Sequence, residues 1–360
     1  EYESIEGTIK LYNNQVFIAD NIKEVIPEYL LLLKGVIDCP DLPLNVSRSQ
    51  LQNDGFVKKI SDYITKKVAE KLSGMCKTER ESYEKYWDDI SPFIKYGVLR
   101  DAKFAEKMTD YILFKDLEEK YCTLPELKEK GKEGVKKEDS VSEKENAGEN
   151  AEEKVQKVYY VSDAVAQSQY ITLFKENHKD AVYLTERIDQ PFITELEAKN
   201  SDLRFQRIDA DVSSAMQASL SKEEEEELKA AGEKLEKAFQ NLLSNDKLHV
   251  KVERLLSETP ASLLTISEES RRMQDMMKMY AVSGMPMGNL PLDESLILNA
   301  KNPLVQYLLK HEDGLESEEG KLMEEQLYDL ARIQNAPLEG DAMKKFVERS
   351  EKVLLKLMKA

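Results

Sequence analysis

Residues 41–52 combine side chains that can bind a phosphate group. Ser47 can cap a helix, and Gln50, three residues later, completes the spacing of a capping box. Arg48 then occupies the first helical position, with Gln52 one turn further on the same face. A guanidinium fork beside free backbone N–H groups and the positive end of a helix dipole favours a phosphate oxygen. The alternative is a capped surface helix whose arginine pairs with a carboxylate.

No nucleotide-binding motif accompanies this arginine. The sequence has no Gly-x-Gly pair and no Gly-Lys-[Ser/Thr], so we expect any nucleotide to bind elsewhere. Arg48 can then act only as a charge supplied to a site on another domain. The three histidines lie far apart and no Cys-x-x-Cys pair exists, so we expect no metal site.

Composition limits the classes of protein to which the chain can belong. Its 360 residues carry a formal net charge of −17, with 34% charged and 41% hydrophobic residues, which disfavours nucleic acid as a partner and predicts several modest cores. No run approaches the roughly 18 apolar residues of a membrane span, and the three scattered cysteines suit a reducing compartment, so we expect a cytoplasmic protein without membrane contact. The first methionine is Met75, and we therefore expect the sequence to be a fragment.

The first third of the chain predicts a small sheet followed by helices. Residues 8–12 and 15–18 read as a hairpin around an asparagine pair, and residues 27–35 as a short buried helix. Residues 56–118 carry apolar side chains at helical spacing, and we expect Gly74 and Pro92 to mark breaks between helices.

The middle of the chain predicts a charged insertion and an α/β subdomain. Residues 130–157 contain 15 charged side chains among 28 and no aromatic, which predicts disorder. Strands at 158–161 and 181–184 flank a helix at 163–176, which makes a βαβ unit. A helix at 191–198 and a strand at 203–206 complete the subdomain.

The last third predicts a helix opening at Ser221, a strand pair at 249–255 and 261–266, a methionine-rich helix and two final helices. The two final helices, at about 318–333 and from Met343 to Leu357, each carry an apolar stripe. A pair of helices cannot bury both stripes within one chain, so we expect a second copy to supply the missing surface in a four-helix arrangement.

Residues 41–48, Asp-Leu-Pro-Leu-Asn-Val-Ser-Arg, closely resemble the signature Asp-Leu-Pro-Leu-Asn-[Val/Ile/Leu]-Ser-Arg-Glu of the heat-shock protein 90 chaperones. Further segments resemble that family in the same order, and together they cover most of the chain: residues 16–20, 26–30, 94–97, 158–161 and 259–261. One departure is Ser49, which stands where the signature usually has glutamate.

The resemblance implies a multidomain fold of the α+β or α/β class. It predicts α/β layers of a middle domain with a helical segment, then a mixed α/β C-terminal domain that ends in a helical dimerisation bundle. The expected parts are the remainder of a large α/β subdomain at 1–56, a helical segment at 57–120, a small α/β subdomain at 121–212 with the insertion at 130–157, and a C-terminal domain at 213–360.

The resemblance also implies a function, that of an ATP-driven chaperone in protein folding and the stress response. Arg48 would reach the γ-phosphate of an ATP bound with magnesium on an N-terminal domain, and Gln52 would partner it. The full-length family is an ATPase, whereas this chain by itself would bind no cofactor and would be inactive.

Two kinds of partner are implied, partly unfolded client proteins and a second copy of the chain. The expected client contacts are Met273, Met276, Met277, Met279, Tyr280 and Phe192. The expected dimer contacts are Leu322, Leu327, Leu330, Phe346, Val347, Val353, Leu354 and Leu357. Ordinary core filling is the alternative for the methionines, and a non-catalytic helical scaffold is the alternative for the whole chain.

Overall fold

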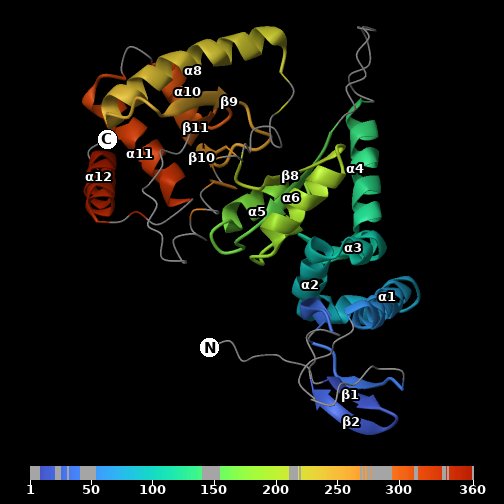
Figure 1. The fold of residues 1–360 in the computed structure, drawn as a ribbon. Coiled ribbons are helices and arrows are strands. Elements are labelled where there is room, and N and C mark those ends of the chain that lie inside the picture. The colour runs from blue at the N-terminus through green and yellow to red at the C-terminus, as the bar shows by residue number, and fades with distance from the viewer. Residues whose placement is uncertain are drawn as a thin grey trace. The chain divides into compact units, whose positions relative to one another are not determined.

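The mixed α/β class predicted from the sequence is confirmed by the computed structural model (Figure 1). The structure describes residues 9–20, 26–30, 32–40, 54–139, 155–210, 218, 220–267, 270, 272–273, 277, 294–311, 315–334, 338 and 340–358, apart from the side chains of 19, 54, 56, 57, 132–139 and 357. Its strands form three sheets, with the orders β2-β1-β3, β5-β4-β7-β6-β8 and β10-β11-β9.

The N-terminal sheet contains the predicted hairpin and one strand that was not predicted. Strands β1 (Ile9–Asn13) and β2 (Val16–Asp20) pair antiparallel, and Asn14 and Gln15 take positive φ angles in the turn between them. Strand β3 (Gly35–Asp38) pairs parallel to β1. The helix expected at 27–35 is reduced to one 3-10 turn, η1 (Glu28–Leu30). Gly35 therefore opens a strand and does not close a helix.

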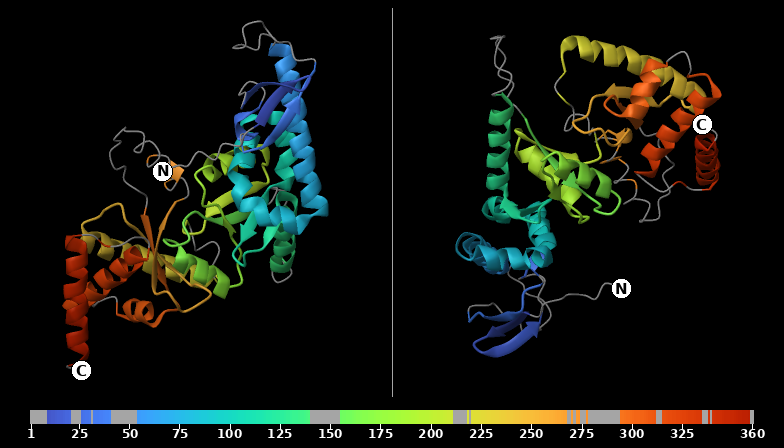
Figure 2. Two further views of the ribbon diagram at one scale, coloured as in Figure 1. Left: turned by 90° about the horizontal axis from the view of Figure 1, so that it is seen from below. Right: turned by 180° about the vertical axis from the view of Figure 1, so that it is seen from behind.

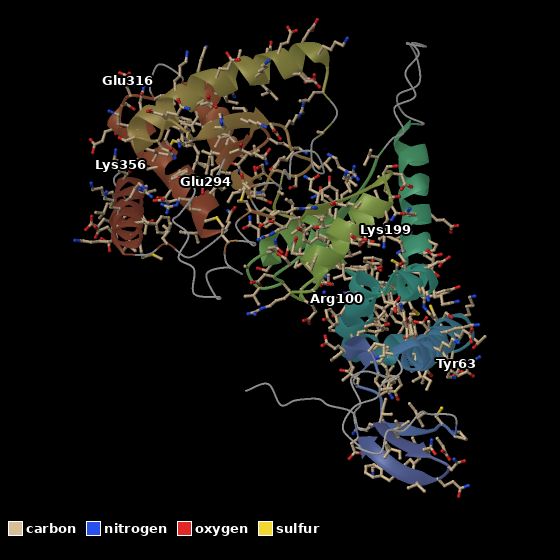
Figure 3. The ribbon with its side chains drawn as sticks, in the orientation of Figure 1. Tyr63, Arg100, Lys199, Glu294, Glu316 and Lys356 are labelled. Atoms are coloured by element: carbon tan, nitrogen blue, oxygen red, sulfur yellow. The ribbon has the colours of Figure 1, made fainter. Side chains whose placement is uncertain are left out.

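Three helices follow and lie side by side, as the views in Figures 1 and 2 agree. They are α1 (Asp54–Thr78), α2 (Arg80–Arg100) and α3 (Ala102–Met108), with a 3-10 turn η2 (Thr109–Tyr111) after them. The expected breaks at Gly74 and Pro92 are wrong, because both residues lie inside helices. Pro92 removes one backbone hydrogen bond, but buried neighbours such as Ile94 hold the helix on both sides of it. On the outer edge of α1, Tyr63 is 61% exposed (Figure 3).

The span predicted to be helical up to residue 120 ends in a strand pair. Strands β4 (Leu113–Asp116) and β5 (Tyr121–Thr123) pair antiparallel. Helix α4 (Leu124–Asp139) follows and runs into the span predicted to be disordered from residue 130. Leu124 and Leu127 are buried and anchor this helix, which then continues through lysines and glutamates that favour helices. Residues 140–154 lie outside the described part of the chain.

The predicted βαβ unit is confirmed. It consists of β6 (Gln156–Val161), α5 (Ser168–Glu176) and β7 (Val182–Tyr183), and Tyr160 pairs with Val182 in parallel register. The further helix and strand are also found, as α6 (Asp189–Lys199) and β8 (Leu203–Arg207).

The C-terminal sheet differs from the predicted strand pair. Strands β9 (His249–Glu253) and β10 (Ser262–Ile266) exist, but β11 (Glu294–Asn299) lies between them. Strand β11 pairs antiparallel with β10 and parallel with β9, so the two predicted strands do not pair with each other.

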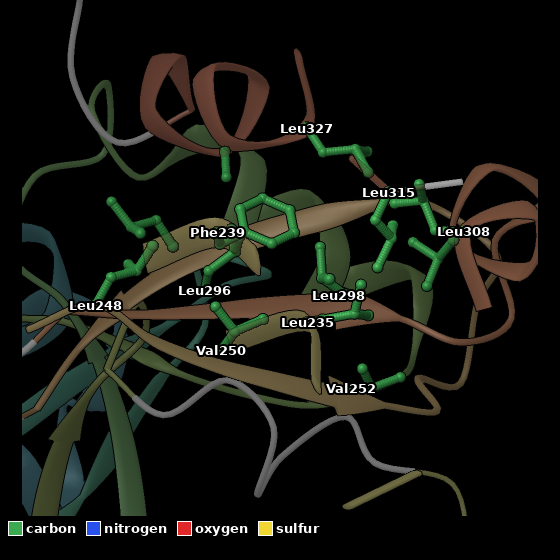
Figure 4. Close-up of a cluster of buried hydrophobic side chains, with 13 residues drawn as sticks. Leu235, Phe239, Leu248, Val250, Val252, Leu296, Leu298, Leu308, Leu315 and Leu327 are labelled. Atoms are coloured by element: carbon green, nitrogen blue, oxygen red, sulfur yellow. The ribbon is translucent and has the colours of Figure 1, made fainter. Parts of the chain in front are cut away.

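Among the described residues, four helices accompany this sheet. They are α8 (Lys222–Leu243), α10 (Pro303–Lys310), α11 (Glu318–Ile333) and α12 (Asp341–Leu357). Helix α8 opens with the predicted Ser221 cap, which forms a full capping box with Glu224. Figure 4 shows the core that α8, α10, α11 and the sheet share, with the ring of Phe239 near its centre. Leu327 of α11 is 2% exposed and packs into this core.

The chain divides into two compact units. One comprises Glu1–Val158 with Glu186–Arg204, and the other comprises Tyr159–Thr185 with Phe205–Ala360. The four-part division predicted from the sequence stays a prediction.

Candidate functional site

Strand β3, which precedes the signature residues 41–48, is held by hydrogen bonds to the end of β1. The backbone N–H of Cys39 donates to Tyr12 O over 2.9 Å. The Asn13 amide donates from Nδ2 to the carbonyl oxygens of Cys39 and Pro40, over 3.1 and 3.2 Å. The chain therefore enters residues 41–53 from a held position. Arg48 and Gln52 themselves lie outside the described residues.

Two of the segments that resemble the family, residues 26–30 and 94–97, pack against each other where η1 meets α2. A Cβ on Gly97 would lie 2.7 Å from the ring of Tyr29 and 2.8 Å from the ring of Phe104. The Tyr29 hydroxyl donates to Asp101 Oδ2 over 2.8 Å and lies 3.4 Å from Thr65 Oγ1. Burial raises the pKa of the Tyr29 phenol well above its usual range, so this group stays a donor at physiological pH. Gly97 is thus required by close packing.

The same segments also contribute polar contacts. The Tyr96 hydroxyl donates to Glu28 Oε2 over 3.1 Å. Lys95, which is 5% exposed, donates from Nζ to Asp189 Oδ1 over 2.5 Å and joins α2 to α6. The ring centre of Phe192 lies 5.9 Å from the same Nζ. Phe192 is fully buried, so in this structure it offers no surface to a client protein.

The methionine-rich segment is described only in part. Met273 is 46% exposed, and Met277 is half-buried. The neighbouring Arg272 donates from Nη2 to Phe205 O over 2.8 Å, which ties the start of the segment to β8. Met276, Met279 and Tyr280 lie outside the described residues.

Helix α12 exposes most of its apolar side chains. The exposed ones are Met343, Val347, Val353, Leu354, Leu355 and Met358, with Leu354 61% and Met358 83% exposed. Phe346 is half-buried, as are Leu322 and Leu330 of α11, and the side chain of Leu357 is not described. Of the predicted dimer contacts, Val347, Val353 and Leu354 are therefore on a surface, whereas Leu327 is in the core.

Sequence reasoning missed the residue by which α12 is attached to α11. Arg349 is 6% exposed and its guanidinium contacts Glu325, Gln326 and Asp329. A usable signal was present, because Arg349 stands between Phe346 and Val353 at helical spacing, where an apolar residue would continue the stripe.

Other kinds of site are not found in the described part of the chain. Over those residues, no group of three or more His, Cys, Asp or Glu side chains is placed to hold a metal ion, magnesium included. Within the same residues, no helix has the length and apolar content needed to cross a membrane.

Comparison with known proteins gives the family. The family described as "Hsp90 protein" matches residues 1–360. Chaperone protein HtpG of Porphyromonas gingivalis is 34% identical over 347 residues, which is 88% of this chain and 47% of that protein. Chaperone protein HtpG of Bacteroides thetaiotaomicron is 34% identical over 317 residues (86% and 44%), and that of Shewanella amazonensis is 29% identical over 311 residues (85% and 46%). The chain spans less than half the length of these curated relatives. Since the match extends from the first residue to the last, the chain belongs to the Hsp90 protein family.

Proposed function

We propose that this chain is the middle and C-terminal part of an ATP-driven, cytoplasmic chaperone that works as a homodimer on partly unfolded proteins. The observation that carries this proposal is the family match over residues 1–360. The relatives bear the name "Chaperone protein HtpG", which supports the proposal. In the proposal, ATP and magnesium bind on an N-terminal domain of the family.

Arg48 is the residue of this chain that assists ATP hydrolysis in the proposal. A guanidinium directed at the γ-phosphate stabilises the negative charge that spreads over its oxygens during phosphoryl transfer. Gln52, four residues further along the chain, orients or supplements that contact. The Asn13 amide donates to the carbonyl oxygens of Cys39 and Pro40, so the chain is held in place just before this segment, which supports the proposal.

The methionine-rich segment is the proposed client surface. Methionine has a flexible, polarizable side chain that repacks against many apolar partners. The exposure of Met273 supports this role, and Met276, Met279 and Tyr280 extend the surface by sequence. Because Phe192 is buried, it is the weakest member of the proposed set.

Helix α12 is the main part of the proposed dimer interface. A second copy of the chain would cover its exposed apolar side chains in a two-fold, self-complementary contact. With a net charge of −17 on each chain, this association must be driven by apolar burial against charge repulsion.

Capture of an unfolded protein tests the proposed function. The whole chain should suppress aggregation of a chemically unfolded, aggregation-prone protein, measured by light scattering. The variant Met276→Ser with Met279→Ser and Tyr280→Ser should lose most of this suppression, because apolar contact is removed while the fold and dimer stay intact.

Val165→Ser is the control for loss of an exposed apolar side chain, since Val165 is 86% exposed and lies on a different segment. It should suppress aggregation as the wild type does. Suppression by the triple variant equal to that of the wild type would assign the methionines to core filling and contradict the client surface.

A further inference from the structure

Helix α12 has very little apolar contact with the rest of its own chain. Among its described side chains, Arg349 is the single buried one. Phe346 and Ser350 are half-buried beside it, and the Arg349 guanidinium lies 5.8 Å from the Phe346 ring centre. An arginine thus occupies the position at which an apolar residue would usually anchor a helix.

The Arg349 guanidinium uses all three of its nitrogens on α11. Nε donates to Gln326 Oε1 over 2.9 Å, Nη1 donates to Glu325 Oε2 over 3.1 Å, and Nη2 donates to Asp329 Oδ2. The Gln326 amide donates in turn to Ser350 Oγ over 3.3 Å. The acceptors span more than one turn of α11, so the planar fork fixes both the position and the rotation of α12.

A second charged contact between the two helices is of a different kind. Lys356 Nζ donates to Glu319 Oε1 over 2.5 Å, but these side chains are 46% and 67% exposed, and Figure 3 shows Lys356 at the outside of the molecule. Exposed pairs contribute little because water competes for both charges. The side chains of the Arg349–Asp329 pair are only 7% and 11% exposed, so this pair is protected from water.

Four of the six exposed apolar side chains lie together on the side of α12 opposite Arg349, whereas Val353 lies about 40° from Arg349. Successive residues of a helix are about 100° apart, so Met343, Val347, Leu354 and Met358 fall within roughly 60° of one another. The centre of this group is about 150° from Arg349. The polar attachment to α11 therefore turns the apolar face of α12 outward.

We infer that Arg349 is the positioning residue that anchors α12 to α11 within each chain, so that the apolar face of α12 is presented to a second copy. This inference rests on the proposed homodimer. It adds that the interface is prepared before association, by polar contacts within the chain and not by contacts with the partner.

The rise in the dimer dissociation constant on loss of the Arg349 anchor follows from the fraction of chains whose α12 is still docked on α11. Apparent affinity falls in proportion to the fraction of competent protein, and in a symmetric dimer both chains bear this loss. If removal of the anchor leaves α12 docked in about one tenth of the chains, the dimer dissociation constant rises roughly a hundredfold.

The test uses the full 360-residue chain and two charge-matched variants. Arg349→Met removes the buried anchor, and Lys356→Met removes the exposed contact between the same two helices. Sedimentation velocity over a concentration series gives the dimer dissociation constant. Hydrogen exchange well below that concentration reports on the α12 amides of the single chain, with the amides of β9, β10 and β11 as a record of folding.

We expect Arg349→Met to raise the dissociation constant about ten- to a hundredfold and to speed exchange in α12 while the strands stay protected. Lys356→Met should stay within about threefold of the wild type. If the strands of Arg349→Met lose protection, Arg349→Lys takes its place. It keeps the charge but cannot reach three acceptors, and we expect a weakening of about tenfold.

The outcomes separate the inference from the proposal on which it rests. A wild type that stays monomeric at every concentration contradicts the homodimer, and exchange in α12 then still tests the anchor. A folded Arg349 variant with wild-type exchange in α12, or with a wild-type dissociation constant, overturns the inference.

Discussion

At the scale of single residues, two glycines in neighbouring helices differ in the space around their Cα atoms. Around Gly97, a Cβ would lie 2.7 Å from Tyr29 and 2.8 Å from Phe104, whose ring centres are themselves 5.1 Å apart. Packed rings cannot move aside without disturbing the core. At Gly74, no atom lies within 4 Å of the Cβ position.

Gly97→Ala should therefore destabilise the protein and Gly74→Ala should stabilise it. Overpacking at Gly97 costs about 1–3 kcal/mol, more than the gain in helix propensity. At Gly74 alanine brings only that gain, roughly 0.5–1 kcal/mol. Urea denaturation of both variants measures the two changes. A Gly97→Ala variant at least as stable as the wild type would contradict the close packing of η1 against α2.

Glu324 is a carboxyl group in an apolar position. It lies on α11 in the stripe of Gly320, Leu327 and Ala331 that faces the core, and it is 1% exposed. Its Oε1 has no hydrogen-bond partner among the described residues. Burial, with a smaller effect from Glu325, raises the pKa of Glu324 to about 7, and Lys321 opposes this shift.

The raised pKa predicts a loss of stability as the pH rises. Between about 4.5 and 7 the folded chain retains the Glu324 proton while the unfolded chain releases it, so the free energy of unfolding falls over this range. Above about 7 the loss is complete. Glu324→Gln cannot ionise, so its stability relative to the wild type should increase by about 1–3 kcal/mol between pH 5 and pH 8.

Denaturation of the wild type and Glu324→Gln at pH 5, 6, 7 and 8 measures this difference. The comparison cancels the titration of other groups, which both proteins share. A difference that stays constant over these four pH values would show that Glu324 is ionised in the folded chain throughout.

At the scale of elements, α2 and α6 are joined by a buried ion pair. The side chains of Lys95 and Asp189 are 6% and 3% exposed, and Asp189 Oδ2 also accepts from Glu186 N over 2.9 Å. Removing one partner leaves the other charge buried and unpaired, which costs about 3–5 kcal/mol. Replacing both by apolar residues of similar volume is often close to neutral.

Lys95→Met should thus lower the free energy of unfolding strongly, and Lys95→Met with Asp189→Leu should recover most of the loss. Lys103→Met is the matched control, because Lys103 pairs with Asp62 over 2.8 Å at the surface and should matter by less than about 1 kcal/mol. Thermal or urea denaturation of the three variants tests this. Equal losses in Lys95→Met and Lys103→Met would contradict the role of burial.

The elements that could be predicted from the sequence are those specified by local pattern. The hairpin of β1 and β2, the βαβ unit of β6, α5 and β7, and the terminal helix α11 all have clear periodicity or turn residues. Strand β11 could not be placed in the same way, since its position between β9 and β10 depends on pairing with segments distant in the sequence.

At the scale of the whole molecule, the candidate sites differ in how they could be found. Arg48 belongs to a contiguous signature and can be recognised from the chain alone. Arg349 acts through acceptors about 20 residues earlier on another helix, and only the packing of α12 on α11 reveals them. The same packing separates Leu327, which fills the core, from Leu354, which is exposed.

The charge and the terminal helices together define the proposed assembly. A chain with a net charge of −17 associates with itself only if apolar burial exceeds the repulsion. In the proposed dimer, Arg349 presents one apolar face per chain for this purpose. Arg48 would then act in an assembly whose two chains also carry the nucleotide-binding domains of the family.

The most direct test of the proposed chaperone cycle is the rate of ATP turnover by this chain joined to an N-terminal nucleotide-binding domain of the family. Arg48→Ala should slow turnover by roughly two to three orders of magnitude, because one transition-state donor is lost, and Gln52→Ala should slow it less. Arg187→Ala, which removes an exposed arginine elsewhere, should leave the rate unchanged. Turnover by Arg48→Ala equal to that of the wild type would contradict the account and favour a non-catalytic scaffold.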